Sequence, residues 1–143
     1  IMFKNKTILV TGGTGSFGKA LISNIISKYS NFKKLIVFSR DELKQHEMLQ
    51  NKIYQHKNLR MILGDIRDFR SIKRALQTVD IIIHAAALKQ VPTAEYNPFQ
   101  FIQTNVIGSQ NLIEAALDTN VSQVVALSTD KASSPINLYG ATK

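Results

Sequence analysis

The stretch that decides the fold reads Thr7-Ile8-Leu9-Val10-Thr11-Gly12-Gly13-Thr14-Gly15-Ser16-Phe17-Gly18. Residues 7–10 are β-branched or apolar and stop at glycines, which predicts a short buried strand. A helix is predicted to begin near Phe17, because apolar residues then recur at helical spacing (Ala20, Leu21, Ile22, Ile25 and Ile26). A strand, a glycine-rich turn and a helix in this order predict an α/β fold whose first turn holds a phosphate group.

Each glycine of the turn has its own role in such a cradle. Gly12 permits the tight turn, Gly15 lets the backbone approach a pyrophosphate, and Gly18 lets the helix pack on the strand. The backbone amides at the helix start then face the anion. We therefore predict that a dinucleotide binds here, with the alternative being a glycine-rich turn without a ligand. The residues assigned to it are Gly12, Thr14, Gly15, Ser16, Phe17 and Gly18.

The residues after the second predicted strand indicate which dinucleotide binds. Residues 34–38 read as this strand, and Ser39 and Arg40 follow where an NAD-binding domain would place an acidic residue against the ribose 2′-hydroxyl. A serine and an arginine suit a 2′-phosphate, so NADP is the predicted cofactor. Asp41 is also assigned to the cofactor site, with capping of the next helix as its alternative role.

The third and fourth predicted strands end in further candidate cofactor residues. Residues 59–63 are followed by Asp65, predicted to accept a hydrogen bond from the adenine amino group, and by Ile66, predicted to pack on the ring. The alternative is helix N-capping by Asp68 or Asp65, and both roles could coexist. The fourth strand, residues 80–84, ends in small side chains that leave room for ribose and pyrophosphate, namely Ala85, Ala86 and Ala87.

Residues 88–98 contain two prolines and read as a shaped loop at the same edge of the sheet. Lys89 in this loop is predicted to contact phosphate or substrate, with a solvated surface lysine as the alternative. Residues 99–117 carry apolar positions at helical spacing, which predicts one long helix with an apolar face. Strand and helix alternate five times, so the predicted fold class is α/β, a doubly wound parallel sheet (Rossmann fold) with strand order 3-2-1-4-5.

The last candidate residues follow residues 124–127, which read as a buried fifth strand. The carboxyl ends of parallel strands are where ligands and catalytic groups collect. Tyr139 and Lys143 lie four residues apart, so on a helix they share one face. The positive charge of Lys143 would favour the phenolate and make Tyr139 a usable general base. The alternative is a chance pair at the start of an amphipathic helix.

Composition limits the function classes. A chain of 143 residues with 44% apolar content suits one domain, residues 1–143. The absence of cysteine excludes disulfides and thiolate chemistry, and the three histidines show no metal-ligand spacing, so no metal site is expected. No apolar run approaches the roughly 20 residues of a membrane span, and an apolar signal core is lacking, so a cytoplasmic, soluble protein is expected. Ile1 before Met2 reads as a cloning residue or an internal start.

The net charge of +8 is compatible with a nucleic-acid surface. The lysines and arginines are dispersed along the chain, however, apart from the pair at 33–34. A dispersed basic surface also suits an anionic small substrate, or a face that further chain covers.

Together these motifs resemble the extended short-chain dehydrogenase/reductase superfamily, whose hallmarks are the Thr-Gly-x-x-Gly-x-x-Gly turn at 11–18 and the Tyr139-x-x-x-Lys143 pair. More narrowly, the chain resembles the family of inverting UDP-N-acetylglucosamine 4,6-dehydratases of pseudaminic acid biosynthesis. The strings that carry this resemblance are residues 12–18, 38–42, 84–89, 91–98, 128–131 and 135–140. Retaining sugar-nucleotide dehydratases have an Asp-Glu pair where this chain has Asp130-Lys131.

The resemblance implies a lyase that uses NADP and UDP-N-acetylglucosamine. Tyr139 would take the proton of the sugar C4 hydroxyl while NADP+ accepts the C4 hydride, and Lys143 would orient the nicotinamide ribose. Lys131, if neutralised, would remove the C5 proton, and Asp130, with a pKa raised by burial, would protonate the departing C6 hydroxyl. Hydride return to C6 and reprotonation of C5 on the opposite face would then give inversion.

Thr129 would hydrogen-bond the sugar, and with Lys89 it completes the implied substrate contacts. A salt-bridged loop pair is the alternative role for Asp130 and Lys131. Members of this family are longer, with a C-terminal substrate lobe and homo-oligomeric assembly, so little turnover is expected from this chain alone. Two other functions stay open, namely a UDP-N-acetylhexosamine 4-epimerase that uses the same Tyr–Lys pair, and a non-catalytic nucleotide-sensing or nucleic-acid-binding module.

Overall fold

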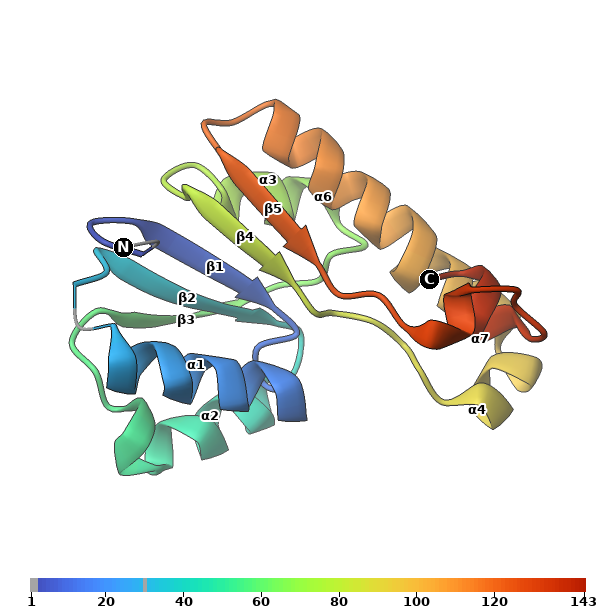
Figure 1. The fold of residues 1–143 in the computed structure, drawn as a ribbon, viewed down its shortest axis with the longest axis horizontal. Coiled ribbons are helices and arrows are strands. Elements are labelled where there is room, and N and C mark those ends of the chain that lie inside the picture. The colour runs from blue at the N-terminus through green and yellow to red at the C-terminus, as the bar shows by residue number, and fades with distance from the viewer. Residues whose placement is uncertain (1–2, 30) are drawn as a thin grey trace.

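A computed structural model describes residues 3–29 and 31–143, so the interpretation of Ile1 and Met2 lies outside the described residues. Five parallel strands form one sheet in the order β3-β2-β1-β4-β5, and helices lie on both of its faces (Figure 1). The strands are β1 (Thr7–Thr11), β2 (Lys34–Ser39), β3 (Leu59–Leu63), β4 (Ile81–His84) and β5 (Gln123–Ala126). The predicted Rossmann fold and its strand order are therefore confirmed.

Helices follow the strands in alternation. The α-helices are α1 (Ser16–Lys28), α2 (Glu42–Gln50), α3 (Phe69–Ala75), α4 (Val91–Tyr96), α5 (Pro98–Phe101), α6 (Gly108–Leu117) and α7 (Leu138–Ala141). Two short 3₁₀ helices, η1 (Lys52–Tyr54) and η3 (Asp130–Ala132), and one π-helical segment, η2 (Ile102–Ile107), complete the chain. No helix in the two described ranges is both long and apolar enough to cross a membrane.

The sheet separates two apolar cores. Successive residues of a strand point to opposite faces, so Ile8 and Val10 of β1 enter one core and Leu9 enters the other. The first core is closed by α1 and α2, and the second by α3 and α6. Every residue of β1 and β4 is buried, as expected of central parallel strands covered on both faces.

The chain between β4 and β5 differs from the prediction in two ways. The loop predicted over residues 88–98 contains helix α4, with Pro92 in its first turn, where a proline removes no helical hydrogen bond. The long helix over residues 99–117 exists as the unbroken run α5-η2-α6, but most of its predicted apolar face is exposed, and of that face Ala116 packs against the second core. Phe99, Val106, Ile113 and Leu117 are exposed, while Leu112 and Ala115 face the core.

The fifth strand is confirmed, but its predicted burial is wrong. All four residues of β5 are exposed, including Val124 at 44% and Val125 at 55%. β5 pairs with β4 along one side only, and within the described chain it forms one edge of the sheet. An apolar run therefore identified the strand but not its position at the edge.

Candidate functional site

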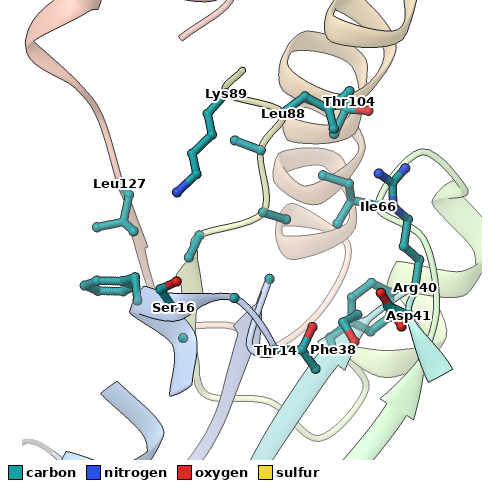
Figure 2. A pocket seen from close by; sticks show the side chains of 18 of the residues that line it. Thr14, Ser16, Phe38, Arg40, Asp41, Ile66, Leu88, Lys89, Thr104 and Leu127 are labelled. Carbon is teal, nitrogen blue, oxygen red and sulfur yellow. The ribbon is translucent and has the colours of Figure 1, made fainter. Parts of the chain in front are cut away.

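A cavity of about 390 Å³ lies at the carboxyl ends of the strands. Its walls come from the segments that follow β1, β2, β3, β4 and β5 and from the chain around α7. Figure 2 shows Arg40 and Asp41 at one end of it, and Lys89 extending its ammonium group toward the other. All seventeen residues assigned to the cofactor from the sequence, from Gly12 in the glycine turn to Lys143, line this single cavity.

Gly12 and Gly18 of the turn are packed too tightly for side chains. Gly12 has a φ of +65°, and a Cβ there would lie 2.8 Å from the backbone nitrogen of Ala86. A Cβ on Gly18 would lie 2.5 Å from Cα of Gly13 and 2.6 Å from the carbonyl oxygen of Gly12. The turn therefore brings β1, α1 and the end of β4 into backbone contact, as a phosphate cradle requires.

The end of β2 carries two cations beside the cavity. Arg40 is exposed there, and Lys44, which the sequence analysis missed, lines the same wall one turn into α2. Asp41 caps α2 by accepting a hydrogen bond from the backbone N–H of Lys44 at 3.0 Å. This bond, aided by the ammonium group of Lys44, holds the pKa of Asp41 below its usual value. The capping alternative for Asp41 is confirmed, and its carboxylate still lines the cavity.

The carboxylate of Asp65 is held by Arg67. It accepts the backbone N–H of Arg67 at 2.9 Å and the guanidinium group at 2.6 Å. Burial opposes ionisation of Asp65, but these hydrogen bonds and the guanidinium charge outweigh it and lower its pKa. The capping alternative is confirmed for Asp68, which caps α3 by accepting the N–H of Arg70, and Asp65 does not cap this helix. Asp65 is thus an oriented anion beside Ile66, which is 4% exposed.

Tyr139 and Lys143 line the cavity at its opposite end, together with Ser128. Asn137 begins α7 by accepting the backbone N–H of Gly140 at 2.9 Å. The ammonium group of Lys143 donates to the carbonyl oxygen of Leu127 at 3.0 Å, and its partial burial lowers its pKa. Tyr139 lies in α7 and Lys143 lies two residues beyond its end, and both side chains line the cavity.

Thr129, Asp130 and Lys131 stand outside the lining of the cavity. The side chain of Asp130 is 89% exposed, and it pairs loosely with Lys131 at 3.8 Å. The hydroxyl group of Thr129 donates a hydrogen bond to the carboxylate of Asp130 at 3.1 Å. This bond, with the charge of Lys131, lowers the pKa of Asp130. The pKa raised by burial that we expected for Asp130 is therefore wrong, because its carboxyl group is exposed in the described chain. The alternative of a salt-bridged loop pair describes this geometry.

Thr104 was missed by the sequence analysis. It lies in η2, is 5% exposed, and lines the cavity close to Leu88 (Figure 2). Its Oγ1 is the one buried side-chain polar atom of the described residues that lacks a hydrogen-bond partner. A buried unpaired hydroxyl costs roughly 1–3 kcal/mol, which a bound polar group would offset. No sequence signal marks it, because a threonine within a helix is usually structural.

The remaining lining residues missed from the sequence are Phe38, Gly64, Leu88 and Leu127. Within residues 3–29 and 31–143, no group of three or more acidic, histidine or cysteine side chains is arranged to hold a metal ion. The cavity instead combines an N–H-lined turn, two cations, an oriented carboxylate and an unpaired hydroxyl. This set of donors and acceptors fits a dinucleotide.

The chain is similar in sequence and in fold to several proteins of known name. A family model described as "Polysaccharide biosynthesis protein" matches residues 8–143. Over 142 residues the chain is 51% identical to UDP-N-acetylglucosamine 4,6-dehydratase (inverting) of Campylobacter jejuni. The matched region is 99% of this chain and 42% of that protein. Over 144 residues it is 46% identical to UDP-glucose 4-epimerase of Rickettsia typhi, with the same two shares.

A solved structure, Pen from Bacillus thuringiensis, matches with a TM-score of 0.93 and 41% identity. The matched region is 100% of this chain and 43% of the chain in that structure. The chain thus spans about 42% of the length of the two curated relatives.

Proposed function

The chain belongs to the polysaccharide biosynthesis protein family, and from this premise we propose that residues 1–143 are the NADP-binding domain of a sugar-nucleotide dehydratase. Its proposed substrate is UDP-N-acetylglucosamine, converted to the 4-keto-6-deoxy sugar with inversion at C5. The 51% identity to the dehydratase of Campylobacter jejuni supports this choice. The observation that carries the proposal is that the glycine turn, the cations after β2 and the Tyr139–Lys143 pair line one cavity.

The chain's own residues would hold the dinucleotide along the cavity. The turn from Gly12 to Gly18 offers backbone N–H groups to the pyrophosphate, and Arg40 and Lys44 offer positive charge to a 2′-phosphate. Asp65, fixed by Arg67, accepts from the adenine amino group. Thr104 offers its unpaired hydroxyl. When bound, the cofactor supplies reversible two-electron redox chemistry.

Tyr139 is the proposed proton acceptor for the sugar C4 hydroxyl. Lys143 supports it with positive charge, and its hydrogen bond to Leu127 fixes the ammonium group at this wall. The roles of Thr129, Asp130 and Lys131 in water elimination stay predictions. They require that the sugar nucleotide, or chain packed over it, remove η3 from water, because burial is what would raise the pKa of a carboxyl group.

Two measurements test this proposal. Isothermal titration of the chain with NADP+ and with NAD+ is expected to show the tighter binding for NADP+. Mass spectrometry of UDP-N-acetylglucosamine incubated with the full-length natural protein is expected to show loss of one water molecule. No dinucleotide binding, or a product with the mass of the substrate, would contradict the proposal.

A 4-epimerase is the second candidate, because it needs Tyr139 and Lys143 but no buried Asp130, and Asp130 is exposed. The 46% identity to the Rickettsia typhi epimerase also favours it. Dehydration lowers the mass of the sugar nucleotide by one water molecule, whereas an epimer keeps the mass of the substrate and is detected by its chromatographic separation from it. A non-catalytic nucleic-acid module would instead bind nucleic acid with steep salt dependence, and Tyr139→Phe would change no chemistry. Homo-oligomeric assembly of the full-length protein and its cytoplasmic location remain predictions.

A further inference from the structure

A buried histidine lies behind the cavity without lining it. His84 is the last residue of β4 and is 5% exposed. Its Nδ1 lies 2.6 Å from the hydroxyl oxygen of Thr11, at the end of β1, and its Nε2 lies 3.1 Å from that of Ser109 in α6. The imidazole therefore joins two strands and a helix that the rest of the site depends on.

The surrounding hydrogen bonds fix where each proton of this group lies. The hydroxyl oxygen of Thr11 accepts the backbone N–H groups of Ala85 at 3.1 Å and Ala86 at 3.2 Å, so its own hydrogen points to Nδ1 of His84. Nδ1 is then an acceptor, and the imidazole hydrogen sits on Nε2 and is donated to Ser109. Ser109 in turn donates to the carbonyl oxygen of Asn105 at 2.6 Å. The network suits only the neutral Nε2–H imidazole.

The same hydrogen-bonded chain continues to the other end of the cavity. The side-chain amide of Asn105 donates to Thr142 Oγ1 at 3.0 Å and to the carbonyl oxygen of Leu88 at 2.9 Å, and it accepts the N–H of Leu88 at 2.8 Å. Thr142 then donates to the carbonyl oxygen of Tyr139 at 3.0 Å. Buried polar groups thus connect the end of β1, where the glycine turn starts, with the backbone of α7.

We propose that His84 is a positioning residue whose neutral imidazole joins the glycine turn to the segment that carries Tyr139 and Lys143, so that both ends of the cavity are held in one arrangement. This inference rests on the proposed function only in treating the cavity as a dinucleotide site. Without the imidazole, the hydroxyl groups of Thr11 and Ser109 each lose a partner inside the protein. The hydroxyl group of Thr11, which accepts the N–H groups of Ala85 and Ala86, is then no longer held in orientation by the ring.

The electrostatic surroundings of His84 agree with the hydrogen-bond assignment. Burial, and secondarily the positive charge of Lys143, lower the pKa of His84 to about 4. Thr11 of β1 and Ser109 of α6, which contact the ring, are uncharged. A second proton on the ring would sit on Nδ1 and face an oxygen that already accepts two N–H groups.

The tautomer can be read directly by long-range ¹H–¹⁵N NMR on the chain labelled at histidine. At neutral pH we expect His84 to show a protonated Nε2 and an unprotonated Nδ1, with or without cofactor. An Nδ1–H tautomer, or a charged ring at neutral pH, would overturn the proposal. This arm does not depend on cofactor binding, so it separates failure of the network from failure of the proposed function.

The coupling is tested by amide hydrogen exchange in His84→Phe and Ser109→Ala, with His46→Gln on exposed α2 as the matched control. His84→Phe is expected to speed exchange of residues 85–88 and 139–143 together and to weaken NADP+ binding about tenfold. Ser109→Ala removes the hydroxyl group between His84 and Asn105 and is expected to speed exchange mainly at residues 139–143. If His84→Phe does not fold, the exchange rates of Ser109→Ala test the proposal alone. Unchanged exchange at 139–143 in the folded variants would overturn the proposal and leave His84 as a core residue of β4.

Discussion

Two glycines of the turn should separate folding from ligand binding when each is replaced by alanine. At Gly18 the added Cβ would lie 2.5 Å from Cα of Gly13 and 2.6 Å from the carbonyl oxygen of Gly12. Both are backbone atoms, so no side-chain rotation can relieve the contact. At Gly15 the nearest atom is the carbonyl oxygen of Gly12 at 3.3 Å, which a shift of a few tenths of an ångström relieves.

The expected free energies follow from these contacts. Alanine is favoured over glycine within a helix by about 1 kcal/mol, and Gly18 lies within α1. Overpacking costs up to roughly 3 kcal/mol, so Gly18→Ala is expected to lower the free energy of unfolding by about 2 kcal/mol. Gly15 is the N-cap of α1 with a φ of −74°, which alanine adopts, so its replacement is expected to cost at most ~1 kcal/mol. The methyl group that Gly15→Ala adds would instead lie where the pyrophosphate is proposed to approach.

Urea unfolding followed by circular dichroism measures the first effect, and calorimetric titration with NADP+ measures the second. Gly15→Ala is expected to fold normally and to bind NADP+ at least about tenfold more weakly, a loss of about 1.4 kcal/mol. A Gly18→Ala protein as stable as its parent would refute the packing reasoning. Unchanged NADP+ affinity in Gly15→Ala would refute the assignment of the turn to a dinucleotide.

Three other changes have equally definite expectations. Thr104→Val removes the unpartnered buried hydroxyl group, so the unliganded chain should be as stable as its parent or more stable by up to ~1 kcal/mol. The same change should weaken NADP+ binding. A large loss of stability in the free chain would contradict this reasoning. Arg40→Ala and Lys44→Ala should each weaken NADP+ binding roughly tenfold and leave NAD+ binding unchanged. Equal losses of affinity for both dinucleotides would argue against a 2′-phosphate site. Folding lowers the pKa of His84 from the ordinary 6.5 to about 4. The neutral ring therefore contributes its whole stabilisation above pH 6.5. This contribution, up to about 3 kcal/mol, is lost as the pH falls toward 4. Urea midpoints measured against pH should therefore slope more steeply in the parent than in His84→Phe, and identical slopes would contradict the buried neutral ring.

The parts of the site that could be predicted from the sequence are those that short stretches of chain define. Gly12, Gly15 and Gly18 have fixed offsets because one turn must reverse the chain and approach a phosphate. Strand ends converge on one edge of a parallel sheet, so Arg40, Asp65 and Ala85 reached one cavity although they lie far apart in sequence.

The parts that could not be predicted depend on what covers a segment. Thr104 looks like any helical threonine, and only the packing of η2 against the cavity leaves its hydroxyl unpartnered. The pKa of Asp130 depends on whether η3 is in contact with water, which its neighbours in sequence do not determine. The hydrogen bonds of His84 to Thr11 and Ser109 join residues 73 and 25 positions apart, so no local spacing in the sequence indicates them.

The exposed strand β5 has a consequence for handling the protein at high concentration. Val124 and Val125 project to opposite faces of a strand whose outer backbone groups have no neighbouring strand in the described chain. Such an edge can template pairing with another polypeptide. Refolding yield should therefore fall as protein concentration rises, even where thermodynamic stability is ample, and a lysine in place of Val125 should restore it by repelling a second molecule.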